Sequence, residues 1–251
     1  MALVLDPRFR VDVVSATPNP QLSCWVAMHQ DYSEGFVAAT RDTWPDETRA
    51  GEICVKRLLA GERGHYGPLE HAQIVLNVGW FPHSVMQQAR THRVGVSFDV
   101  QSLRYTGSRV VAAAQRALTE GLQELEEVFY LRPAGGPYRD RQGKDYTYTE
   151  SSRAVDLELC QIAALRYARM IEQGYAEEHA RGVLPFDVRQ HFVVSFSLRA
   201  FLHFMDLRSK ADAQEEIRML CLLMWPHFKA WVPQIAEWYE HTRLGRARLA
   251  P

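Results

Sequence analysis

Between Arg90 and Arg104 the chain gathers side chains that are suited to binding an anion. The stretch holds one histidine, three arginines and two serines. Arginine presents a planar fork of N–H donors that matches the oxygens of a phosphate. Gln88 to Arg93 is predicted where a short helix ends, and such a position also offers free backbone groups. These residues indicate recognition of a phosphorylated ligand; the alternative is a solvated helix end with scattered arginines.

Ser97 to Arg104 continues this candidate site along the chain. If the segment is extended, alternate residues share a face, which places the Ser102 hydroxyl beside the Arg104 guanidinium. A hydroxyl next to a guanidinium is a common way to hold a phosphate. The alternative is a polar strand face, but Asp99 is the one acidic residue near three arginines. Local ion pairing therefore does not account for the arginines.

Arg199 to Asp212 supplies a second group of polar side chains. On a helix, Arg199, His203 and Asp206 share one face, while the neighbouring aromatic residues can pack inward. Arg208 follows at the end of this predicted helix, where the helix dipole also favours a cation. Arg208 is therefore either a ligand-binding arginine or a simple helix-terminal cation.

Histidines near the turn at Gly64 to His71 raise the question of a metal site. The separations among His71, His83 and His92 do not match a compact ligand pair, and the sequence lacks the H-E-x-x-H pattern. We therefore expect no metal, and we interpret His71 as a packed, hydrogen-bonded core histidine.

The four cysteines give no sign of nucleophilic chemistry. Cys24, Cys54, Cys160 and Cys221 form no C-x-x-C pair, and each falls in an apolar helical pattern. Buried packing thiols fit this pattern better than reactive ones. The chain also has no G-x-G-x-x-G turn and no G-x-x-x-x-G-K-[ST] loop. Arginines, histidines and irregular backbone must then hold the phosphates of any dinucleotide.

Hydrophobic periodicity predicts many helices and few strands. Helices are predicted over residues 21–32, 46–59, 82–90, 108–131, 151–172, 198–207, 211–225 and 233–244, and strands over residues 72–80 and 191–197. Residues 61–68 are predicted to turn, residues 132–148 to form an exposed excursion, and Pro226 and Pro233 to break helices. We expect an α+β fold in which residues 1–251 form a single domain with a small mixed sheet and several helices.

Composition excludes several classes of function. The net charge is -1, so the whole molecule does not attract nucleic acid over long range. No apolar run reaches the roughly 18 residues of a membrane span, and the start of the chain lacks a secretory pattern, so we expect a cytoplasmic protein without a membrane partner. Four of the 29 basic residues are lysine and 25 are arginine. This bias reflects either genome composition or anion recognition.

Four separated pieces together resemble the flavin-dependent thymidylate synthase family. They are Gly64 to His71, which is similar to the family's H-x-x-P-x-E-H, Gln88 to Arg93 joined to Ser97 through Tyr105, Ala180 to Pro185, and Ser197 to Ile217. Each piece alone is weakly specific. Their order and spacing make the combination specific.

The chain departs from the family's signature at several positions. The signature R-H-R, seven residues and serine becomes Thr91-His92-Arg93, eight residues and Ser102. Three further positions hold Val100 where a glutamate is expected, His203 where an asparagine is expected, and Asp212 where a histidine is expected. These departures indicate a variant subfamily, in which Arg90 is a candidate to replace the missing arginine.

The resemblance implies a reaction and an assembly. The reaction is the reductive methylation of dUMP to dTMP, for dTTP biosynthesis, with FAD as cofactor, methylenetetrahydrofolate as one-carbon donor and NADPH as reductant. No enzyme thiol attacks the pyrimidine in this family, which agrees with the cysteine pattern. The assembly is a homotetramer whose sites lie between subunits.

The resemblance also implies roles for individual residues. The dUMP site would comprise Gln88, Ala89, Arg90, Thr91, Gln101, Ser102, Leu103, Arg104, Arg181 and Arg208, and the FAD site Gly67, Thr91, His92, Arg93, Ser197, Arg199 and His203. Arg208 would be the catalytic residue, because its guanidinium would stabilise negative charge on the uracil amide as the ring becomes nucleophilic. Ser102 would position dUMP and would not attack it.

Two other classes of function use the same arginines. A nucleotide-binding regulatory module would bind its ligand without chemistry. An RNA-binding protein would use the arginine clusters against phosphates, but the near-zero net charge counts against it.

Overall fold

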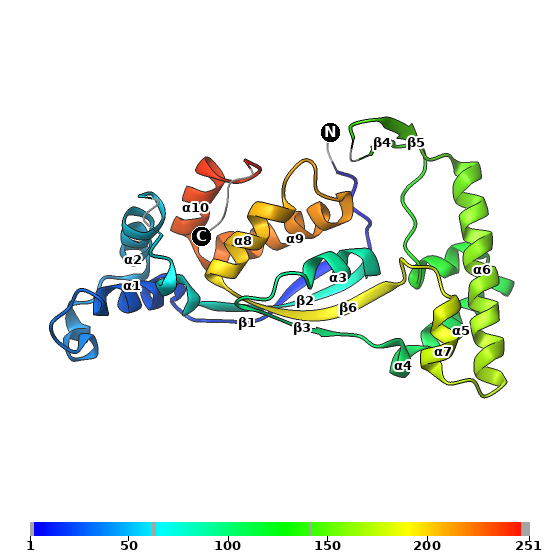
Figure 1. The fold of residues 1–251 in the computed structure, drawn as a ribbon, viewed down its shortest axis with the longest axis horizontal. Coiled ribbons are helices and arrows are strands. Elements are labelled where there is room, and N and C mark those ends of the chain that lie inside the picture. The colour runs from blue at the N-terminus through cyan, green and yellow to red at the C-terminus, as the bar shows by residue number, and fades with distance from the viewer. Residues whose placement is uncertain (1–2, 62–63, 141, 247–251) are drawn as a thin grey trace.

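A four-stranded sheet forms the centre of the molecule (Figure 1). The computed structural model describes residues 3–61, 64–140 and 142–246. The strands are β1 (Arg10–Ala16), β2 (Gln73–Pro82), β3 (Val96–Val100) and β6 (Arg189–Ser197), in the order β1-β2-β6-β3. The expected α+β fold is confirmed. The expected mixed sheet is wrong, because β6 inserts between β2 and β3 and runs opposite to both, and β1 runs opposite to β2.

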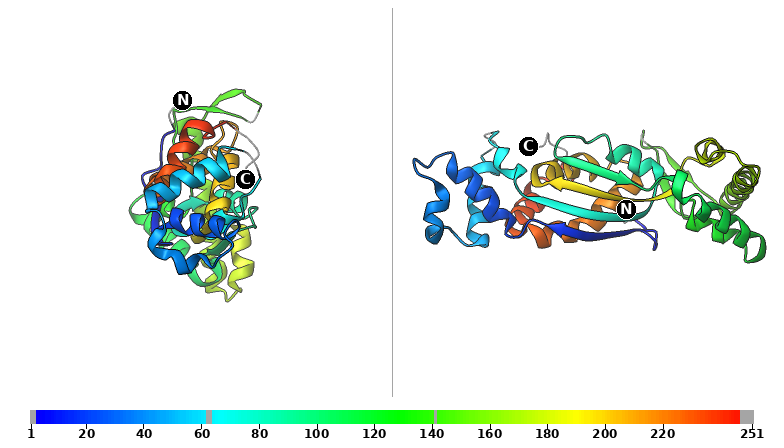
Figure 2. Two further views of the ribbon diagram at one scale, coloured as in Figure 1. Left: turned by 90° about the vertical axis from the view of Figure 1, so that its left-hand side faces the viewer. Right: turned by 90° about the horizontal axis from the view of Figure 1, so that it is seen from below.

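One face of the sheet carries the main hydrophobic core. Ile74, Leu76 and Val78 of β2 are fully buried, because alternate residues of a strand point to the same face. Phe196 and Val194 of β6 lie directly across from Ile74 and Leu76 and are buried with them. Helices α3 (His83–Ala89), α8 (Leu198–Arg208) and α9 (Glu215–Trp231) pack over this face, and the view from below in Figure 2 shows the opposite face in front of them.

The other elements surround this layer at both ends. The remaining helices are α1 (Pro20–Gln30), α2 (Glu47–Cys54), α4 (Leu103–Thr106), α5 (Ser108–Thr119), α6 (Glu150–Glu172), α7 (Glu177–Ala180) and α10 (Pro233–Thr242). Short helical turns are η1 (Val37–Thr43), η2 (Val55–Leu59), η3 (Gly67–Glu70), η4 (Leu122–Glu127) and η5 (Arg181–Val183). Strands β4 (Pro137–Arg139) and β5 (Asp145–Thr147) form a separate hairpin. Figure 1 shows α1 and α2 at one end of an elongated molecule and α5, α6 and α7 at the other.

A second hydrophobic cluster holds the helical end together. It comprises residues of α5, α6 and η4, such as Val110, Leu125 and Tyr167, all almost fully buried. The buried guanidinium of Arg189 joins this end to the sheet. It pairs with Asp6 over 2.6 Å and donates to backbone carbonyls of β2 and η4. No helix in the described ranges has both the length and the apolar character needed to cross a membrane.

Most predicted helices are confirmed, with informative exceptions. The helix predicted over 108–131 is interrupted at Gly121, whose φ of 116° is outside the helical region. The break predicted at Pro226 is wrong, because α9 continues to Trp231. Buried Phe228, whose ring stacks on Phe201 at 4.6 Å, holds the helix past the proline. Thr149 caps α6, since its hydroxyl accepts from the Ser152 amide at 3.1 Å.

Two strands and parts of two loops differ from the sequence-based expectation. β1 was not predicted, because it is an edge strand on which Val11 alone is buried and no alternation is visible. β3 was not predicted in its own right, and it ends at Val100. Residues 132–148 form the expected excursion, built on the hairpin β4–β5. Residues 62–63 of the predicted turn and residue 141 of the excursion lie outside the described ranges.

Candidate active site

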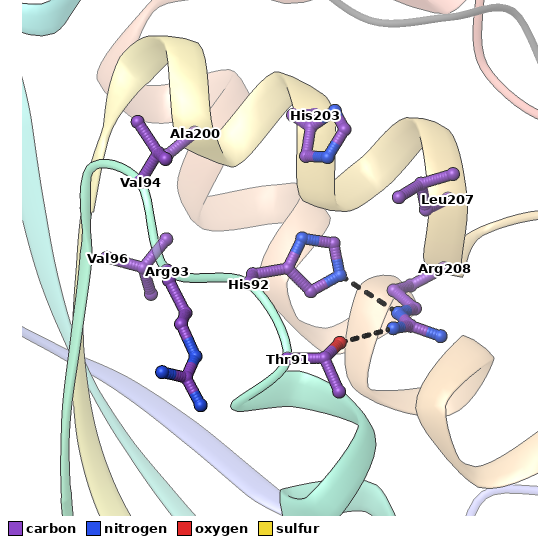
Figure 3. Close-up of a pocket in the computed structure, with 9 residues that line it drawn as sticks. All are labelled: Thr91, His92, Arg93, Val94, Val96, Ala200, His203, Leu207 and Arg208. Carbon is purple, nitrogen blue, oxygen red and sulfur yellow. Dashed lines mark hydrogen bonds between the residues drawn. The ribbon is translucent and has the colours of Figure 1, made fainter.

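A cavity of about 330 Å³ lies where the segment after α3 meets α8. It is lined by Thr91, His92, Arg93, Val94, Val96, Ala200, His203, Leu207 and Arg208 (Figure 3). Four of these side chains are apolar, and the others carry nitrogen or oxygen atoms. The cavity therefore suits a ring system with polar edges or a charged tail.

Arg208, at the end of α8, is held in this cavity by neutral acceptors. Its Nε donates to His92 Nε2 at 3.0 Å, and its Nη2 donates to Thr91 Oγ1 at 2.9 Å and to the Gln88 carbonyl at 3.1 Å. Figure 3 shows the first two bonds converging on the guanidinium. Arg208 forms no ion pair within residues 3–61, 64–140 and 142–246. Its charge is thus available to a ligand.

His92 is a buried base beside this cation. Burial first, and then the positive charge of Arg208 and the nearby His203 ring, together lower the pKa of His92 to about 4. The His92 ring is therefore neutral at neutral pH, and its Nε2 accepts from Arg208. Burial also lowers the pKa of Arg208 from its ordinary value. A neutral histidine lets the arginine keep its charge without repulsion from a second cation.

Glu70 organises the adjoining end of the site. Its carboxylate accepts from Ser197 Oγ at 2.7 Å and pairs with Arg199 Nη1 at 3.3 Å. Gly95 lies against these groups with a φ of 68°, and a Cβ there would collide with the Ser197 hydroxyl. Glycine is therefore required at this point of the lengthened spacer. Gly67 is exposed at the start of η3, the turn that carries Glu70.

The other predicted nucleotide-binding residues lie on α4 and η5. Ser102 is the N-cap of α4, and its Oγ accepts from the Arg104 amide at 3.3 Å. The predicted extended arrangement of Ser102 and Arg104 is therefore wrong, because a capping serine starts a helix and ends the strand. Arg104 lies 3.7 Å from Glu178 of α7, and Arg181 follows at the start of η5. The backbone amide of Gln101 donates to the His191 carbonyl of β6 at 2.9 Å.

The predicted site thus falls into two groups within one chain. The cavity group is Gln88, Ala89, Thr91, His92, Arg93, His203 and Arg208, with Ser197 and Arg199 beside it. The α4–η5 group is Gln101, Ser102, Leu103, Arg104 and Arg181. No hydrogen bond or ion pair joins the two groups in the described part of the chain. Figure 1 shows α4 and α7 toward the helical end, away from α8.

Several single-residue expectations need correction. Asp206 does not share the site face of α8. It is buried against α10, where it pairs with Arg243 at 2.7 Å and accepts from Tyr239 at 2.6 Å. His71 is exposed and not a core histidine, because it follows η3 on the outside of the turn. Arg90 is exposed at the end of α3 and does not line the cavity.

Sequence reasoning missed three polar residues that support the site. Glu70 is one, although it belongs to the H-x-x-P-x-E-H piece and could have been found there. Gln214 accepts from the Gln88 side-chain amide and donates to Glu216 at 2.7 Å. Glu216, just 2% exposed, also binds Arg132 at 2.7 Å. These contacts join residues far apart in sequence, so spacing alone did not reveal them.

The four cysteines take no part in the site. All four cysteines are free and buried. Burial raises the pKa of Cys54 to about 12 and that of Cys160 to about 11. The prediction of buried packing thiols is confirmed. Within the described ranges, no three histidine, cysteine, aspartate or glutamate side chains cluster as a metal site would require.

Comparison with known proteins identifies the class of this fold and site. Residues 12–234 match the family model described as "Thymidylate synthase complementing protein". The flavin-dependent thymidylate synthase of Haloarcula marismortui is 32% identical over 96% of this chain and 99% of its own length, and that of Halobacterium salinarum is 30% identical over 96% and 100%. The chain therefore belongs to the flavin-dependent thymidylate synthase family. This result confirms the expectation of an enzyme of that family.

A solved structure confirms the fold class independently. The UMP/dUMP methylase PolB from Streptomyces cacaoi, bound with 5-Br UMP, superimposes with a TM-score of 0.70 and covers 100% of both chains at 21% identity. The same methylase bound with 5-Br dUMP gives a TM-score of 0.69 over 97% of each chain. At this identity the likeness concerns the fold.

Proposed function

We propose that this chain catalyses the reductive methylation of dUMP to dTMP with FAD, methylenetetrahydrofolate and NADPH. The observation that carries the proposal is Arg208, an uncompensated guanidinium at the edge of a cavity, held by three neutral acceptors. The names of the relatives, and the nucleotides bound to the methylase of the same fold, support dUMP as the substrate.

Arg208 would act on the pyrimidine by charge alone. When C5 of uracil becomes nucleophilic, negative charge develops on the ring amide, and a fixed cation beside it lowers the energy of that state. The low polarity of a half-buried site strengthens this interaction. Arg208 need not transfer a proton, and with four buried thiols no cysteine is required as a nucleophile.

The cavity fits part of a flavin dinucleotide. Its apolar side chains can pack against a ring, and Arg93 is exposed at its rim without an ion-pair partner among the described residues. An exposed, unpaired arginine suits a diphosphate. Gly67, Thr91, His92, Arg93, Ser197, Arg199 and His203 would hold the FAD. When bound, the flavin would supply the reducing equivalents that NADPH delivers.

The α4–η5 group would complete the nucleotide site from another subunit. Ser102, Arg104 and Arg181 offer a hydroxyl and two guanidinium groups, which suit the phosphate of dUMP. Their separation from Arg208 within one chain supports a homotetramer with shared sites.

We further infer that residues 1–251 act as one domain, since the matched family region crosses both hydrophobic clusters. We also infer that the enzyme works in the cytoplasm on phosphorylated metabolites.

The experiment that tests this proposal is a spectrum followed by turnover. Purified protein should be yellow, with a flavin absorption band that changes when dUMP is added. With methylenetetrahydrofolate and NADPH it should form dTMP, and UMP assayed in parallel would define its preference for the sugar. A colourless protein that binds no added FAD would contradict the proposal. Protein that binds dUMP without turnover is instead the regulatory module.

A further inference from the structure

Thr91 occupies a special place beside Arg208. Its hydroxyl donates to the Gln88 carbonyl at 2.7 Å, which commits its one hydrogen. Its lone pairs are then directed outward, and Arg208 Nη2 donates to them at 2.9 Å. The same Nη2 donates to the Gln88 carbonyl at 3.1 Å, so hydroxyl, carbonyl and guanidinium form a closed triangle.

The triangle fixes Arg208 without adding charge. His92 holds Nε of the guanidinium on one side, and Thr91 with the Gln88 carbonyl holds Nη2 on the other. Thr91 supplies the shorter of the two bonds at Nη2, so its hydroxyl holds this side of the guanidinium more closely than the Gln88 carbonyl does. The remaining Nη1 of Arg208 makes no hydrogen bond within the described ranges and is free for a ligand.

The position of Thr91 makes this role specific to its side chain. Thr91 follows Arg90, the C-cap of α3, where the last carbonyls of the helix have no partners within the helix. Since Thr91 is exposed, its hydroxyl is not needed to satisfy a buried group.

We propose that Thr91 is a positioning residue, whose hydroxyl orients the Arg208 guanidinium toward the pyrimidine ring. This inference rests on the proposed function, because it assumes that Arg208 acts on that ring. It also assigns Thr91 a task apart from contact with dUMP or FAD. The hydroxyl, and not the methyl group, carries the role.

Replacement of Thr91 by valine and by serine tests the hydroxyl. Thr91→Val keeps the shape and removes the hydroxyl, and kcat should fall about 10- to 100-fold, the usual effect of losing a hydrogen bond to a charged group. Thr91→Ser keeps the hydroxyl and should stay within a few-fold of the parent enzyme. KM for dUMP should change little, since valine keeps the shape of the Thr91 side chain and loses the hydroxyl that Arg208 uses.

Thr119→Val is the matched control. Thr119 also ends a helix, and its hydroxyl donates to the Arg116 carbonyl, three residues before it, at 3.3 Å, but no arginine of the described ranges donates to that hydroxyl. Its removal should leave kcat unchanged. Equal rates for Thr91→Val and Thr91→Ser, or a change in KM alone, would overturn the proposal.

A second measurement reads the position of Arg208 without turnover. In protein labelled with ¹⁵N-arginine, the Nε–H resonance that disappears in Arg208→Lys belongs to Arg208. Thr91→Val should speed its exchange with water, whereas Thr91→Ser should not. Unchanged exchange in both overturns the inference. Failure of the parent protein to form dTMP overturns the proposed function alone, so the two failures are distinguishable.

Discussion

Arg208 Nε donates a hydrogen bond to His92 Nε2 at 3.0 Å, and this bond requires a neutral histidine. The His92 ring is 8% exposed and its pKa is lowered to about 4. A proton on Nε2 would place two donors face to face. The protonation state of one buried ring is thus tied to the orientation of the proposed catalytic arginine.

The first prediction concerns stability against pH. Between the folded pKa of about 4 and the ordinary value of 6.5, the unfolded chain binds a proton at His92 that the folded chain does not. Stability should therefore be lost as pH falls from 6.5 toward 4, by about 3 kcal/mol from this residue. Urea unfolding of His92→Gln at pH 7 and pH 4.5 should show a smaller difference than the parent protein. His71→Gln, at an exposed histidine, is the control. Equal pH slopes for all three proteins would contradict this account.

The second prediction separates catalysis from cofactor binding. Arg208→Ala should lower kcat on the order of 100- to 1000-fold, as removal of a charge-stabilising donor does. The flavin absorption band of the purified protein should remain, because the expected FAD contacts lie on other side chains. Arg49→Ala, which removes an exposed arginine of α2, should leave both quantities unchanged. If Arg208→Ala turns over normally, Arg208 is a simple helix-terminal cation.

The third prediction tests whether sites are shared between subunits. Arg208→Ala and Arg181→Ala should each be nearly inactive alone. Co-expressed, they should regain about one quarter of the parent activity, since random pairing of chains gives that share of sites an intact Arg208 and an intact Arg181.

A different pair of variants controls for that result. Co-expressed Arg208→Ala and Gln88→Ala chains should recover no activity. Gln88 and Arg208 belong to the same cavity group, so neither chain contributes an intact cavity group. Absence of recovery in the Arg208–Arg181 pair as well would place the whole site within a single chain.

Sequence patterns predicted what depends on short spacing. Helix α8 and its terminal arginine follow from apolar periodicity between Ser197 and Arg208, and β2 and β6 from runs of branched and aromatic residues. The cavity residues Thr91, His92 and Arg208 were all expected at a site, and the structure brings them together. The division of the site residues into the cavity group and the α4–η5 group could not be predicted from spacing, because it depends on where α4 lies after the end of β3.

The missed features depend on packing between distant segments. β1 shows no alternation because one of its faces is open and the other is covered along part of its length. Helical spacing predicts Asp206 on the site face of α8, but Asp206 forms an ion pair with Arg243, which follows α10. The Gly95 requirement arises from the Ser197 hydroxyl, a hundred positions away in the chain. None of these neighbours is visible in a local window.

The last prediction concerns Glu216, which joins the hairpin region to the cavity. Its carboxylate binds Arg132 through two oxygens, at 2.7 Å and 3.2 Å, and accepts from Gln214, which in turn holds the Gln88 amide. Glu216→Ala should lower the free energy of unfolding by about 3 kcal/mol, the low end for breaking a buried pair, because Arg132 is partly exposed and can rehydrate. It should also weaken dUMP binding, since Gln88 loses its support. Glu237→Gln, at an exposed position of α10, should change neither quantity. Calorimetric titration with dUMP and urea unfolding check both effects, and a destabilised variant with unchanged dUMP affinity would show that Glu216 supports the fold alone.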